Sequence, residues 1–122
     1  MKLVFIIGAG SFIGGVFRYL LSLLVQIKTT TNFPLGTLTV NIIGCFFIGI
    51  VFGIFDKGQI SNEWKMFLAT GILGGFTTFS AFSIETVTLF RGGYFGYALL
   101  YVLASVFLGL LTTYGAYLLI KQ

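Results

Sequence analysis

Histidine, cysteine, proline and charged side chains are scarce in this sequence of 122 residues. With no histidine and a single cysteine, Cys45, the chain can form neither a disulfide framework nor a Cys/His metal cluster. Charged residues make up only 8% of the chain and form no basic cluster, so the net charge of +4 does not indicate nucleic-acid binding. No nucleophile–base pair occurs either, so we expect no enzyme. Cys45 lies in an apolar run and is interpreted as a small buried hydrophobe.

Apolar residues dominate instead: 57% of the chain is hydrophobic and its mean hydropathy is +1.06. This composition excludes a disordered chain and disfavours a soluble globule. The length predicts one domain. The N-terminus begins like a signal peptide, with Lys2 and an apolar run. That run is long and contains Arg18, and no convincing small-residue cleavage site follows, so we interpret it as a first membrane span.

Four apolar segments are expected to cross the membrane as helices, at residues 3–26, 35–55, 64–90 and 97–120. Each is longer than the ~20 residues that a membrane helix needs. The only proline, Pro34, directly precedes the second segment, where the first turn of a helix tolerates it. The sequence therefore predicts an all-α membrane protein with four transmembrane helices.

The third segment contains an unusual stretch, Thr70–Glu85, which reads TGILGGFTTFSAFSIE. Glycine is a poor helix former, and non-helical backbone at membrane depth persists only where it is buried in protein or lines a wet cavity. We therefore predict a helix broken near its middle, at a functional site. Backbone carbonyls released by such a break bind hard cations such as Na⁺, and two breaks meeting at a two-fold axis would supply four oxygens.

Polar side chains within the other spans leave two interpretations open. Arg18 either faces a vestibule or extends its charged group to the membrane interface. Asn41 and Thr37 are four residues apart and share a helix face; they either link helices or line a polar path. Tyr101, with Ser105 and Gly109, forms a small polar stripe on the last segment that is explained by packing or by function.

Phe79 and Phe82 are three residues apart and therefore lie on one helix face. A phenyl ring has a positive edge, which can favour a small dehydrated anion, although ordinary packing explains the spacing equally well. The intramembrane polar groups are mostly neutral donors, and no ring of acidic residues favours cations. Because four helices cannot enclose a wide pore, transport would need an oligomer.

The basic residues give almost no orientation signal, because four lie on the side of the termini and three on the other. The positive-inside rule therefore cannot select a topology for this chain. Insertion in both orientations with antiparallel pairing is one explanation.

Three motifs together resemble the Fluc (CrcB) family of fluoride channels: GGVFRY at 14–19, PLGTLTVNIIGCFFIG at 34–49 and TGILGGFTTFSAFSIE at 70–85. The resemblance covers essentially the whole chain. It implies an antiparallel dual-topology homodimer in the cell (inner) membrane with two anion paths. It also implies passive export of cytoplasmic fluoride, which confers fluoride resistance, and a central Na⁺ that is structural and not transported.

The resemblance assigns roles to individual residues. Na⁺ would lie on the backbone carbonyls of Gly74 and Thr77 from both subunits, and Arg18 would be the vestibule cation. The fluoride path would be formed by the ring pair and polar groups Phe79, Phe82, Asn41, Ser80, Ser83, Thr37, Tyr101 and Glu85.

This chain departs from the family pattern at Ala81, where many members have Thr, and at Gly109, where some have a polar residue. Both departures concern the polar track and leave the Phe pair unaffected. The alternative function is a small four-helix proton-coupled antiporter of drugs or cations, which needs a central carboxylate. Glu85 is the only acid inside a span. A membrane protein without transport is the third possibility.

Overall fold

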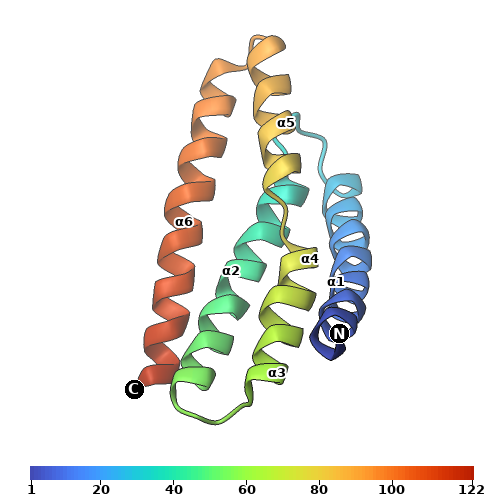
Figure 1. Cartoon of the computed structure of the whole chain (residues 1–122). Coiled ribbons are helices and arrows are strands. Elements are labelled where there is room, and N and C mark those ends of the chain that lie inside the picture. The colour runs from blue at the N-terminus through green and yellow to red at the C-terminus, as the bar shows by residue number, and fades with distance from the viewer.

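Four long helical segments make up the computed structural model of the chain, which describes residues Met1–Gln122 (Figure 1). Three of them are continuous: α1 (Lys2–Ile27), α2 (Leu35–Asp56) and α6 (Phe95–Lys121). The third segment, Asn62–Arg91, consists of α3 (Asn62–Lys65), η1 (Met66–Leu73), α4 (Gly74–Phe76) and α5 (Phe79–Arg91). All four are long and apolar enough to cross a membrane. The predicted all-α architecture is thus confirmed.

The segments lie side by side with α2 near the centre (Figure 1). Helix α6 packs along α2, and α1 packs mainly against η1 and α4 on the other side. Both termini lie at the end of the bundle that carries the turn between α2 and α3, while the turn between α5 and α6 lies at the opposite end. The interrupted third segment therefore lies next to both α1 and α2.

Apolar side chains cover the outside of the bundle. Only 20 of the 122 residues are buried, and phenylalanine and leucine side chains such as Phe5, Phe12 and Leu119 are largely exposed. In water such a surface would be strongly unfavourable, because exposed apolar area costs free energy. The surface is suited to hydrocarbon, in which the helices satisfy their backbone hydrogen bonds internally.

Glycines allow close contacts between helix backbones at two places in the bundle. A Cβ atom on Gly14 of α1 would collide with the carbonyl of Ile72 in η1. A Cβ on Gly49 of α2 would likewise collide with the carbonyl of Thr113 in α6. These helices pack backbone against backbone, as small residues permit in membrane bundles.

The third segment departs from regular α-helix in two ways. Its Met66–Leu73 portion is a π-helix, a form that is rare and often found at functional sites. Between α4 and α5, Thr77 and Thr78 have extended backbone, with φ, ψ of −92°, 158° and −149°, 121°. The Thr77 amide still donates to the Leu73 carbonyl, and the helical ladder of hydrogen bonds is interrupted from the Thr78 amide onward.

Candidate functional site

The interruption at Thr77 and Thr78 redirects two backbone N–H groups to side-chain acceptors. The amide of Thr78, which in a continuous helix would donate to the Gly74 carbonyl, donates to Oδ1 of Asn41 at 2.9 Å. The amide of Ala81, which would donate to the Thr77 carbonyl, donates to Oγ1 of Thr78 at 3.1 Å. The carbonyl oxygens of Gly74 and Thr77 thereby lose their usual helical donors.

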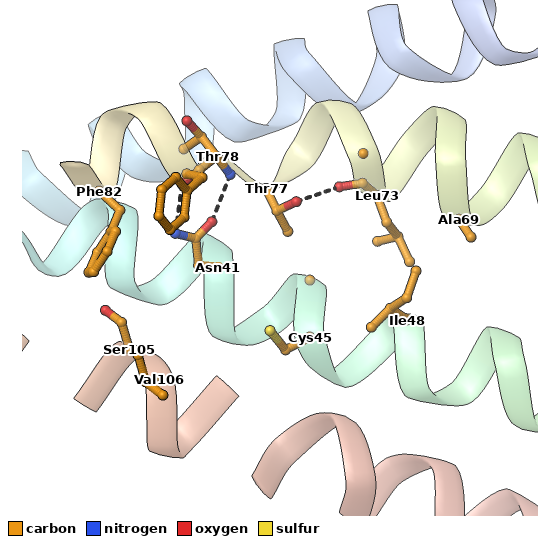
Figure 2. Close-up of a pocket in the computed structure, with 13 residues that line it drawn as sticks. Asn41, Cys45, Ile48, Ala69, Leu73, Thr77, Thr78, Phe82, Ser105 and Val106 are labelled. Carbon is orange, nitrogen blue, oxygen red and sulfur yellow. Dashed lines mark hydrogen bonds between the residues drawn. The ribbon is translucent and has the colours of Figure 1, made fainter. Parts of the chain in front are cut away.

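Asn41 of α2 bonds to Thr78 through both ends of its amide. Besides accepting from the Thr78 amide, it donates from Nδ2 to the Thr78 carbonyl at 3.0 Å (Figure 2). The side chain thus pairs with the extended backbone as a neighbouring strand would. Thr78 in turn is the N-cap of α5, which is a preferred role for threonine.

Two other carbonyls near the interruption have side-chain donors. Nε of Arg18, on α1, donates to the carbonyl of Gly75 at 3.1 Å. The carbonyl of Leu73 accepts from both the amide and the hydroxyl of Thr77, each at 3.0 Å. These bonds satisfy groups that would be expensive to leave unpaired in a membrane.

A cavity of about 380 Å³ opens beside the interruption. Its walls come from α2, η1, α4, α5 and α6 together with Thr77 and Thr78 (Figure 2). Five predicted site residues line it: Asn41, Gly74, Thr77, Phe79 and Phe82. The structure therefore brings the predicted ring pair, the predicted cation ligands and one predicted polar group together at one cavity.

The two predicted phenyl rings are neighbours at this cavity. The ring centroids of Phe79 and Phe82 are 5.5 Å apart, with an angle of 47° between the ring planes. Phe82 also contacts Tyr101, at 5.1 Å between centroids. Phe79, at the start of α5, is 77% exposed in the single chain, so most of its surface lacks a protein neighbour.

Three more predicted residues form a hydrogen-bonded cluster behind Phe82. The hydroxyl of Thr37 donates to Oε2 of Glu85 at 3.0 Å, and the hydroxyl of Tyr101 donates to Oε1 at 3.5 Å. Thr37 and Tyr101 are buried. The cluster joins α2, α5 and α6 around the only acidic side chain within the span interiors, and it does not line the cavity.

The structure does not bring Ser80, Ser83 and Arg18 to the cavity of the single chain. Ser80 is exposed and lies 3.3 Å from the Thr78 hydroxyl, oxygen to oxygen. Ser83 is exposed on α5. Arg18 is half-buried on the far side of the third segment, at its bond to Gly75.

Several cavity residues were not predicted as site residues. Thr78 and Ser105 supply polar groups, and Cys45 and Val106 complete the wall between α2 and α6. The Ser105 hydroxyl is buried and has no hydrogen-bond partner. Its place in the stripe with Tyr101 and Gly109 was the available signal, while Thr78 lies within the stretch that predicted the break.

The apolar surface and the four spans define a multi-pass helical membrane protein, with a cavity beside the interruption of its third segment. Residues 5–117 match the family described as CrcB-like protein, Camphor Resistance (CrcB). The chain belongs to this family, as the sequence motifs predict.

Curated relatives match over nearly their full length. One from Flavobacterium psychrophilum is 42% identical, over 100% of this chain and 99% of the relative. One from Thermus thermophilus is 44% identical, over 96% of this chain and 94% of the relative. One from Phocaeicola vulgatus is 41% identical, over 91% and 92% respectively. Each of the three is named a fluoride-specific ion channel, FluC.

Proposed function

We propose that the chain is a fluoride-specific ion channel. The observation that carries the proposal is the pair of phenyl rings, Phe79 and Phe82, placed beside an interrupted membrane helix in one cavity. The names of the relatives support the identity of the ion. Passive flow of fluoride out of the cell through such a channel would lower the intracellular concentration and confer fluoride resistance.

The chemistry of the cavity is suited to a small anion. Phenyl edges carry partial positive charge and attract an anion weakly, so the ion can enter and also leave, as conduction requires. Asn41 adds a neutral polar group to the same wall. Thr37, Glu85 and Tyr101 continue a polar track behind Phe82. Arg18, on α1, is proposed to attract anions into a vestibule.

The functional unit is proposed to be an antiparallel homodimer whose subunits insert in opposite orientations in the cell membrane. Phe79 is largely exposed and Gly74 is exposed in the single chain, which supports a partner surface over this face. Ser80 and Ser83 are exposed on α5, the helix that carries Phe79. We propose that they join the fluoride path at the partner surface. The near-equal distribution of basic residues between the two membrane sides also favours dual topology.

A structural Na⁺ is proposed at the dimer axis, held by the carbonyl oxygens of Gly74 and Thr77 from each subunit. The residues fit such an ion, because both carbonyls have lost their helical donors to Asn41 and Thr78, and carbonyl oxygens are the ligands that hard cations prefer. When bound, the ion would supply fixed positive charge between the subunits.

A flux assay tests the proposal. Purified protein in liposomes loaded with potassium fluoride should release fluoride when valinomycin carries the compensating potassium, and it should release far less chloride from matched liposomes. Equal release of both anions, or none, contradicts the proposal. Proton-driven efflux of a lipophilic cation that disappears in Glu85→Gln would instead support the antiporter.

A further inference from the structure

We propose that Asn41 is a positioning residue, whose side-chain amide holds the interruption between α4 and α5 open through its two hydrogen bonds to Thr78. It thereby sets where the Gly74 carbonyl and the Phe79 ring lie. The inference deepens the proposed function and rests on it for the transport measurements alone.

The two hydrogen bonds between Asn41 and Thr78 support this inference because Thr78 lies in the interruption. Its amide is the group that would continue the helix by donating to Gly74, and Asn41 accepts from that amide at 2.9 Å. Its carbonyl belongs to the N-cap residue of α5, and Asn41 donates to it at 3.0 Å. One side chain from another helix therefore binds both backbone groups of Thr78, one of the two residues that separate α4 from α5.

The donor count of the amide shows how much of the Asn41 side chain is committed to Thr78. An asparagine side chain has one acceptor oxygen and two N–H donors. The oxygen and one N–H are used by Thr78. The second N–H has no partner in the single chain, so transport measurements must distinguish positioning from anion binding. A positioning residue should change the maximal flux and leave the fluoride concentration for half-maximal flux nearly unchanged.

The matched control is Thr113, whose hydroxyl donates to the carbonyl of Cys45 at 3.0 Å. This bond also joins α2 to a second helix, and neither of its residues belongs to the interruption between α4 and α5. Thr113→Val removes it with little change in shape. Asn41→Ala and Thr113→Val thus each remove a side-chain link to the same helix.

Amide hydrogen exchange on the purified full chain tests the clamp directly. In Asn41→Ala, the peptide that covers Thr77–Ala81 should exchange about tenfold faster or more, since two hydrogen bonds are lost. Peptides of α1 and α6 should remain as in the wild type. Thr113→Val should leave the Thr77–Ala81 peptide unchanged. Wild-type exchange of this peptide in Asn41→Ala overturns the inference, as does equal acceleration along the whole chain.

Asn41→Leu is a second variant, of similar size, for the case that Asn41→Ala does not fold. Leucine has neither a donor nor an acceptor, so the same peptide should again exchange faster than in the wild type. Unchanged exchange in whichever variant folds overturns the inference.

Transport measurements separate positioning from ion binding and from a merely structural role. In the Asn41 variants that fold, maximal fluoride flux should fall about tenfold, while the fluoride concentration for half-maximal flux stays within about twofold of wild type. The reverse pattern overturns the inference in favour of direct anion binding. If the wild type itself conducts no fluoride, the proposed function fails, and the exchange data alone decide the role of Asn41.

Discussion

Helix α2 makes two contacts of opposite kinds along its length. Toward α6 it is closed: Gly49 meets the backbone of Thr113 so tightly that a Cβ would collide there. The Thr113 hydroxyl bonds to the carbonyl of Cys45. Toward the third segment it is open: Asn41 bonds to an extended residue, Thr78, and a cavity of about 380 Å³ lies beside them.

The difference shows where stability and function are separated in this small bundle. At Gly49 the closed contact gains dispersion energy from small residues and leaves no space for a Cβ atom. The open contact gives up helical hydrogen bonds at Gly74 and Thr77, which is costly in a membrane. Non-helical backbone persists at membrane depth only where it is buried in protein or lines a wet cavity, so mutations at the two contacts should have different consequences.

The largest expected effect on the open contact is loss of transport without loss of folding. Phe79→Ile or Phe82→Ile should lower fluoride flux by about tenfold or more, because the aliphatic side chain has no positive edge. Fluoride release from liposomes measures this. Phe79→Ile should fold normally, since Phe79 is 77% exposed in the chain.

Phe107→Ile is the matched control for the ring variants. Phe107 is 60% exposed on α6 and lies outside the cavity. Fluoride flux through the Phe107→Ile variant should match that of the wild type. Wild-type flux in both ring variants would remove the role that we assign to the rings.

Substitutions at the closed contact should have the opposite effect. They should lower the stability of the fold, while the molecules that do fold transport fluoride normally. Gly49→Ala places a methyl group against the Thr113 carbonyl and should destabilise the fold by about 1–3 kcal/mol. Gly115→Ala, also on a helix, meets nothing within 4 Å and should be neutral or slightly stabilising. Thermal unfolding in detergent measures both, and equal melting temperatures would contradict the assignment.

The sequence was sufficient to predict the four helices, because their apolar runs are long and bounded by polar turns. It also predicted that Phe79 and Phe82 share a helix face, and their rings are 5.5 Å apart between centroids. Glycine content alone directed attention to Thr70–Glu85. These are local properties, which follow from spacing along the chain.

The bonding partners at the site could not be predicted in the same way. Asn41 and Thr78 are 37 residues apart, and Arg18 and Gly75 are 57 apart, so each pair depends on how the helices pack. The π-helical turn of Met66–Leu73 has no clear signature in the sequence. The ions, too, were suggested by family motifs and not by spacing.

The cluster behind Phe82 allows a smaller test of the open contact. Thr37→Val removes the 3.0 Å bond to the Glu85 carboxylate and should cost about 1.5 kcal/mol, while Tyr101→Phe removes only a 3.5 Å bond and should cost less. Thermal unfolding of the two variants shows which substitution lowers the stability more. The reverse order would mean that Tyr101 is the principal partner of the carboxylate.

The smallest effect on stability is expected at Ser80 and Ser83, which are exposed on α5. Ser80→Ala and Ser83→Ala should change the free energy of unfolding by less than about 0.5 kcal/mol, as surface substitutions do. If a second copy covers this face and brings both hydroxyls to the fluoride path, flux should nevertheless fall. Normal flux in the double variant would restrict the path to the residues that line the cavity of the single chain. Reduced flux with unchanged stability would place the path between two copies, since neither side chain lines the cavity of the single chain.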